Sequence, residues 1–457
     1  MKVYFYALMA MSLIITQISA DEPSSNLDGE AEEVVVTASI LNPSRIINPL
    51  YVIDGDDIED DVTTSLGEAV DSYPGVSIAD FGPAVGQPII RGMSGPRVKI
   101  LKNGIVNRDV SGLGADHLND IDLNDIEQIE IIKGPSSLLY ANGTSGGIIN
   151  VVDNCIAPED FTESEFIAGL ETQSVNDGDV QHFNYKDNIG GFNINAGYKK
   201  TELGNFDIPN DAIIHEEDHD GHDDHEEEML SFVKNSDLEI ESTKFGISRS
   251  GDWGYFGLSA DNLESMYGIP FHGEHADEHD DGHDDHDDDH GDEHGEERIF
   301  SATDQESFTI RGQYNIGGNL LNSIEYTYRD TDYELVEAHA EEEGHDDHGD
   351  EHDEHAPTVF TNDATEYGAI FDISTDNLIQ KISVNFVDED SAIVGEESFM
   401  NPANNEETTF GYFLSADLDA FYLDAGFRLD QIERSGSVTD DEHGDIDYYN
   451  YDDDTNS

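Results

Sequence analysis

Basic side chains, cysteine and long apolar segments are all scarce in this sequence of 457 residues. It has 20 Lys and Arg residues against 103 Asp and Glu residues, which gives a formal net charge of −83 at pH 7. Because nucleic acid is itself strongly negative, this balance argues against nucleic acid as a partner. The single Cys155 excludes an internal disulfide bond.

One apolar run lies at the N-terminus, where residues 1–20 read MKVYFYALMAMSLIITQISA. A basic Lys2, the apolar run over residues 3–15 and the small Ser19 and Ala20 predict a secretory signal peptide that is cleaved after Ala20. The run is too short for a spanning helix, and no later stretch reaches about 20 apolar residues. If the mature protein lies in a membrane, we therefore expect it to cross without helices.

Three tracts combine histidine with acidic residues, from His215 to His225, from His272 to His294 and from His339 to His355. The second, within HGEHADEHDDGHDDHDDDHGDEHGEE, has too little apolar surface to offset the entropy of ordering the chain, so it must lie in water. Neutral imidazole and carboxylate are the ligands that zinc and its neighbours prefer. Composition alone leaves two interpretations open, a metal-binding tract and a solvated acidic spacer.

A short β-branched segment, EEVVVTAS at residues 32–39, follows a polar leader. An exposed strand-former beside a flexible leader is suited to pairing with the sheet edge of another protein. The same residues could equally form the first strand of the next domain. The segment alone does not separate these two interpretations.

Residues 52–155 have the pattern of a compact α+β unit. Leu66, Ala69 and Val70 share one face of a short predicted helix. Alternation predicts strands around Val98 and Ile100 and around Ile129 and Ile131, while Gly134-Pro135 and Gly146-Gly147 mark turns.

This region resembles the plug of TonB-dependent outer-membrane receptors. The resemblance is carried by Ile90-Arg91-Gly92, by Val98 to Leu101 running into Asn103-Gly104, and by IEQIEIIKGPSSLLYANGTSGGIINV at residues 126–151. It implies a plug domain at 40–155 and no enzymatic activity or required cofactor. It also implies a periplasmic leader at 21–39, in which a TonB-type protein would contact Glu33, Val34, Val35, Val36, Thr37 and Ala38. Lys102-Asn103 and Ala141 depart from the commoner family residues without disturbing the resemblance.

From Glu165 onward the sequence divides into segments with two-residue alternation, the pattern of outer-membrane strands with one face to lipid and one to the lumen. Phe192, Ile194, Ala196 and Tyr198, for example, alternate with polar or small residues. The predicted fold is thus an α+β plug domain followed by an antiparallel transmembrane β-barrel in the cell outer membrane. Outer-membrane lipid is then an expected partner.

The predicted connections alternate in length. Those near 188–191, 250–253, 316–319, 374–377 and 417–419 are tight, whereas 202–241, 264–305, 332–365 and 388–408 are long. Every second connection of an antiparallel barrel lies on the same side, and the long ones are extracellular. The three histidine tracts fall in long connections, so we expect them to share one mouth outside the cell.

The alternation gives about eleven strands, against about 22 in the barrels of the family. Residues 164–457 are therefore expected to form the N-terminal part of a barrel. An open sheet edge at membrane depth is not viable. A half-barrel alone is not expected to transport.

The predicted activity is energy-coupled uptake of a transition metal, with zinc favoured, because histidine-rich extracellular loops resemble those of zinc-uptake receptors. The alternatives are a receptor for a siderophore, haem or another organic chelate, and a surface metal-binding fragment without transport. His215 to His219 spells HExxH, but a peptidase needs that motif on a buried helix, and calcium would leave the histidines unexplained. The candidate metal ligands are His215, His219, His222, His225, His272, His275, His279, His283, His286, His290, His294, His339, His345, His348, His352 and His355.

Overall fold

The structure is a computed structural model. It describes residues 51–55, 58, 65–82, 84–114, 116–210, 212, 231–270, 298–318, 320–340, 356–375, 378–395, 398, 400–418, 422–442 and 445–456. All of these residues belong to one compact unit that begins at Thr37. None of the helices within these ranges is long and apolar enough to cross a membrane.

The first part of the described chain, residues 51–153, is called the plug unit below. Its main sheet has the strand order β1-β6-β7-β4-β5, in which β4 and β7 are parallel and the other neighbours antiparallel. These strands are β1 (Tyr51–Asp54), β4 (Val98–Lys102), β5 (Ile105–Val106), β6 (Ile126–Ile132) and β7 (Gly147–Asp153). The other elements are the strand pair β2 (Val76–Phe81) and β3 (Val85–Ile90), the helix α2 (Leu66–Val70) and the 3₁₀ helices η1 (Gly95–Arg97) and η2 (Pro135–Leu139).

The plug unit confirms the α+β pattern. The Ser65 side chain accepts a hydrogen bond from the Glu68 backbone N–H at 3.3 Å and so caps α2, whose Leu66 and Val70 are buried. Strand β6 is buried along nearly its whole length, not only on alternate residues. Its polar Glu130 is accommodated because Asn150 donates a hydrogen bond to it at 2.9 Å.

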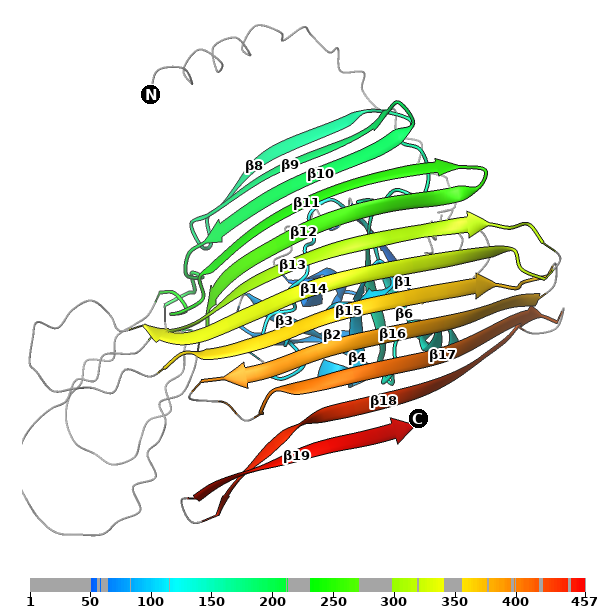
Figure 1. Ribbon diagram of the computed structural model, residues 1–457. Coiled ribbons are helices and arrows are strands. Elements are labelled where there is room, and N and C mark those ends of the chain that lie inside the picture. Colours follow the sequence, from blue (N-terminus) through cyan, green and yellow to red (C-terminus); the bar gives the residue numbers. More distant parts are fainter. Residues whose placement is uncertain are drawn as a thin grey trace, which may run out of the picture. The chain divides into compact units, whose positions relative to one another are not determined.

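The second part is one sheet of 12 strands, in which each strand pairs antiparallel with the next in the sequence. Figure 1 shows these strands side by side from β8 to β19. They are β8 (Glu165–Gln173), β9 (Gly178–Ile189), β10 (Phe192–Leu203), β11 (Leu238–Gly251), β12 (Gly254–Gly268), β13 (Arg298–Asn315), β14 (Ser323–Ala340), β15 (Thr358–Asp372), β16 (Leu378–Val394), β17 (Ala403–Asp417), β18 (Tyr422–Glu442) and β19 (Asp445–Asn456). The sequence had indicated about eleven such strands.

The alternation along these strands separates two faces, as predicted. Phe192 is 42% exposed on the outer face, whereas its neighbour Asn193 is 1% exposed and donates a hydrogen bond to the backbone oxygen of Glu159. Leu429 is likewise 51% exposed beside the buried Asp430. Apolar side chains therefore cover the face that meets lipid, and polar side chains face inward.

Long and short connections alternate between β9 and β17, whereas 174–177 and 443–444 are short connections at the end of the sheet where long ones were expected, and the strands reach further than the sequence indicates. The connections 204–237, 269–297 and 341–357 replace the predicted loops 202–241, 264–305 and 332–365, and the fourth long connection shortens to 395–402. Strands continue through polar residues because the ladder of backbone hydrogen bonds does not require apolar side chains. The end of the sheet where these connections begin is called the tract end below.

Candidate metal-binding site

Of the sixteen predicted metal ligands, only His339 lies among the described residues. It was predicted in a loop but belongs to strand β14, where its backbone is paired with Ile299. The other fifteen histidines, and the predicted TonB contact at residues 33–38, lie outside the described residues. Their roles remain predictions.

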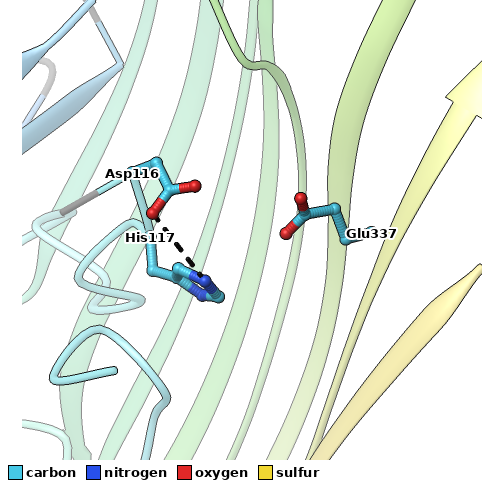
Figure 2. A group of neighbouring side chains, drawn as sticks. All are labelled: Asp116, His117 and Glu337. Carbon is cyan, nitrogen blue, oxygen red and sulfur yellow. Dashed lines mark ion pairs between the residues drawn. The ribbon is translucent and has the colours of Figure 1, made fainter. Parts of the chain in front are cut away.

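The described residues contain a different group of potential metal ligands, Asp116, His117 and Glu337. Asp116 and His117 lie in the plug unit between β5 and β6, and Glu337 lies on β14. One potential ligand atom from each lies within 4.8 Å of the others. Figure 2 shows the Glu337 carboxylate reaching from its strand towards the His117 ring, beside which lies Asp116.

Strand pairing places this group at the tract end. Glu337 is paired with Thr358, the first residue of β15. The connection 341–357, which carries most of the third histidine tract, begins just beyond the end of β14. Inward-facing Glu337 thus lies near the end of the sheet where the connection 341–357 begins.

His117 is buried against an aromatic ring. The residue is 6% exposed, and its ring meets the Phe360 ring edge-on, with 5.1 Å between the centroids. Burial lowers the pKa of the imidazole, against the opposing effect of the Asp116 carboxylate, so the ring is neutral at neutral pH and can offer a lone pair.

The two ring nitrogens of His117 have different surroundings. Nε2 lies 4.0 Å from Asp116 Oδ1, whereas Nδ1 is buried and has no hydrogen-bond partner among the described residues. A buried polar atom without a partner costs about 1–3 kcal/mol. A bound cation near this ring would remove part of that cost.

Gly114 leaves the space that these side chains occupy. A Cβ atom at this position would lie 2.4 Å from Asp116 Oδ1 and 2.5 Å from His117 Cδ2. Both distances are well below van der Waals contact. The two side chains can therefore adopt their observed positions only beside a glycine.

Charged contacts join the plug unit to the sheet below this group. Lys102 is paired with Asp261 on β12 and lies 3.9 Å from Asp153. Burial alone would raise the pKa of Asp153, but the charges of Lys102 and Lys244 outweigh it and lower that pKa to about 2. On another side, Arg108 lies 3.1 Å from Glu366 of β15.

The pKa of the buried Asp120 shifts in the opposite direction to that of Asp153. It is 0% exposed, and burial followed by the nearby Asp109 charge raises the pKa of its carboxyl to about 7. The hydroxyl groups that hydrogen-bond to it oppose this rise only in part. Asp120 therefore changes its charge near neutral pH.

Comparison with known proteins identifies the plug unit. The family model described as "TonB-dependent Receptor Plug Domain" matches residues 43–148. The vitamin B12 transporter BtuB of Vibrio vulnificus (strain CMCP6) is 28% identical over 208 residues, which are 44% of this chain and 32% of that protein. The chain thus spans about a third of the length of this relative.

Solved structures share the fold of both parts. The copper transporter OprC is similar with a TM-score of 0.62 at 14% identity, over 90% of this chain and 61% of that one. The FrpB iron transporter of Neisseria meningitidis (F3-3 variant) gives 0.60 at 11% identity, over 89% and 62%. Residues 43–148 thus match the plug domain of TonB-dependent receptors, and the described residues share their fold with solved outer-membrane transporters.

Proposed function

We propose that this chain is the receptor for energy-coupled uptake of a transition metal ion, with zinc as the preferred ion. The observation that carries the proposal is the group of Asp116, His117 and Glu337 at the tract end. An ion that enters the outer mouth would meet these ligands at the junction of the plug unit and the sheet. The metal is the cargo of the receptor.

The donor types favour zinc over the alkaline-earth ions. One imidazole and two carboxylates match the nitrogen and oxygen ligands of zinc, and three protein ligands leave a fourth position for water or another group. Calcium takes about six to eight oxygen ligands and gains nothing from a buried imidazole. Copper and nickel also bind such donors, so competition among these metals is part of the test.

Binding requires the group to contract. Bonds of about 2.1 Å in a tetrahedral site put ligand atoms about 3.4 Å apart, while those of Asp116, His117 and Glu337 spread over up to 4.8 Å. The Glu337 carboxylate and the His117 ring would have to approach each other for all three ligands to bind one ion. A bound ion would thus connect the plug unit to strand β14.

The histidine tracts are proposed to capture the ion first. Their carboxylates attract cations over a distance, and their imidazoles favour transition metals over magnesium and calcium. They would raise the local ion concentration above the buried group. The competing interpretation, solvated acidic spacers, predicts that removing their histidines leaves uptake unchanged.

Energy is proposed to arrive through residues 33–38, paired as a strand with a TonB-type protein of the periplasm. The outer membrane holds no ATP, so the work that moves the plug must come from the inner membrane. The segment EVVVTA has the β-branched composition that strand addition requires.

A second candidate is a receptor for a metal chelate. The similarity to a vitamin B12 transporter favours it, as does the fold shared with the ferric yersiniabactin uptake receptor FyuA of Yersinia pestis, at a TM-score of 0.56 and 13% identity. This candidate predicts uptake only in the presence of an organic chelator. The fragment without transport, by contrast, predicts metal binding without uptake.

The test uses Glu337→Gln and His117→Ala, with Glu334→Gln as the matched control. Glu334 lies on the same strand but is exposed, so the control removes the same charge away from the site. We expect the two site variants to lose tight zinc binding and zinc uptake by cells, and the control to keep both. Wild-type affinity and uptake in both site variants, or uptake that needs an added chelator, would contradict the proposal.

A further inference from the structure

The plug segment 116–120 carries two of the three metal ligands, and buried tyrosine hydroxyls attach it to the sheet. Tyr267 lies on β12 and Tyr333 on β14, and their exposed fractions are 0% and 1%. Neither side chain belongs to the proposed ligand set. What they contact shows how the two halves of the site are held together.

The Tyr267 hydroxyl fixes the backbone on both sides of His117. It donates a hydrogen bond to the backbone oxygen of Asp116 at 3.1 Å and accepts one from the backbone N–H of Leu118 at 3.1 Å. The direction of the His117 side chain is set by the backbone between these two points. A single hydroxyl group therefore orients the imidazole relative to the sheet.

Tyr333 connects the same segment to the strand that carries the third ligand. Its hydroxyl donates to Asp120 Oδ2 at 2.7 Å. Tyr333 and Glu337 are four residues apart on the inward face of β14, a separation of roughly 13 Å along the strand. The bond to Asp120 therefore fixes the distance between the plug segment and the strand that bears Glu337.

Two further hydroxyls complete the contact. Ser265 of β12 donates to Asp120 Oδ1 at 3.2 Å, and Thr303 of β13 donates to Asp120 Oδ2 at 3.3 Å. Asp120 is thus bonded to three adjacent strands. Each of these three bonds comes from a neutral hydroxyl group.

We infer that Tyr267 and Tyr333 are positioning residues of the metal site, whose hydroxyls hold segment 116–120 against the sheet so that His117 and Glu337 can share one ion. The inference rests on the proposed function, because it takes the Asp116, His117 and Glu337 group as the site. The plug unit carries Asp116 and His117, and strand β14 carries Glu337. We expect these two parts to separate when a TonB-type protein pulls the plug unit. Loss of the tyrosine bonds then lowers the affinity and releases the ion inward.

The experiment uses Tyr267→Phe and Tyr333→Phe, which remove only the hydroxyl groups, in the receptor purified from outer membranes and in cells. Tyr328→Phe is the matched control, because the Tyr328 hydroxyl on β14 bonds to Asp330 at 3.2 Å, away from segment 116–120. We expect the Kd for zinc and the KM of uptake to rise about tenfold or more in each variant. The maximal uptake rate per receptor and the control variant should stay unchanged.

The outcomes separate this inference from the proposed function. If Glu337→Gln and His117→Ala bind zinc as the wild type does, the proposed function fails. If those two variants lose zinc while both phenylalanine variants keep the wild-type Kd, only the positioning role is overturned. It is also overturned if the phenylalanine variants lower the maximal rate per receptor and leave Kd and KM unchanged.

A milder variant covers the case in which a phenylalanine variant fails to reach the outer membrane. Thr303→Val removes the 3.3 Å bond to Asp120 and a hydrogen bond to the Tyr333 hydroxyl, and it keeps the side-chain shape and both tyrosines. A raised Kd for zinc, smaller than that expected for Tyr333→Phe, supports the positioning role. A Kd equal to that of the wild type contradicts it.

Discussion

Replacing Gly114 by alanine tests the metal site without touching any proposed ligand. The added Cβ atom would lie 2.4 Å from Asp116 Oδ1 and 2.5 Å from His117 Cδ2. Both side chains must then move by about 1 Å to regain normal contact distances of about 3.5 Å. Metal–ligand bonds tolerate only about 0.2 Å, so we expect the zinc affinity to fall by about 10- to 100-fold, as when groups around a metal site are altered.

The assay is titration of the purified receptor with zinc, with Gly112→Ala as the matched control. Gly112 lies two residues before Gly114. A Cβ atom at Gly112 would meet its nearest neighbour, Pro96 Cγ, at 3.5 Å, which is an ordinary van der Waals contact. The control removes the same glycine freedom without crowding the site. Equal zinc affinity in Gly114→Ala, Gly112→Ala and the wild type would contradict the proposed metal site.

Three further predictions concern pH and energy coupling. Burial lowers the pKa of His117, whereas acidic neighbours favour the protonated form of the tract histidines. Acidification should therefore release zinc from the tracts first, near pH ~6.5 or above, and from the buried group in a second step at lower pH. His117→Ala should lack the second step, and a single step of zinc release in the wild type contradicts the prediction. The pKa of Asp120 is raised to about 7 in the docked plug, whereas an exposed aspartate titrates near ~4. Between these two pH values the docked plug holds a proton that the undocked plug has lost, so docking should weaken as pH rises from about 4 to about 7. The measurement is the pH dependence of hydrogen exchange in residues 116–124, corrected for intrinsic rates. Asp120→Asn should abolish this pH dependence, and a variant that keeps it would contradict the role of Asp120. Val35→Pro removes a backbone donor and should abolish uptake while zinc binding persists; normal uptake would exclude strand pairing.

Much of the fold could be predicted from the sequence, because lipid on one side and water or plug on the other impose a strict alternation. Phe192 and Asn193 follow this rule, and so do Leu429 and Asp430. The ends of the strands could not be predicted in the same way. Strand β14 continues to Ala340 through residues of the third tract, since strands beyond the bilayer need backbone pairing but no apolar face.

The candidate site was harder to predict than the fold. Sequence reasoning favoured tracts in which histidine is abundant, whereas His117 is a single histidine in an irregular segment. Its only local signal is the adjacent acid in GADHLND. Glu337 lies far away in the sequence at the start of an acidic stretch, and only the pairing of β14 and the docking of the plug unit bring it near His117.

The most direct test of the metal site is the position of zinc in crystals of the receptor, found by anomalous scattering at the zinc edge. The account predicts a peak within about 2.0–2.2 Å of one imidazole nitrogen of His117 and of a carboxylate oxygen of Glu337, with Asp116 as a further ligand. It also predicts that the peak disappears in Glu337→Gln. Zinc bound elsewhere, with no peak between His117 and Glu337 at a zinc concentration that saturates uptake, would contradict it.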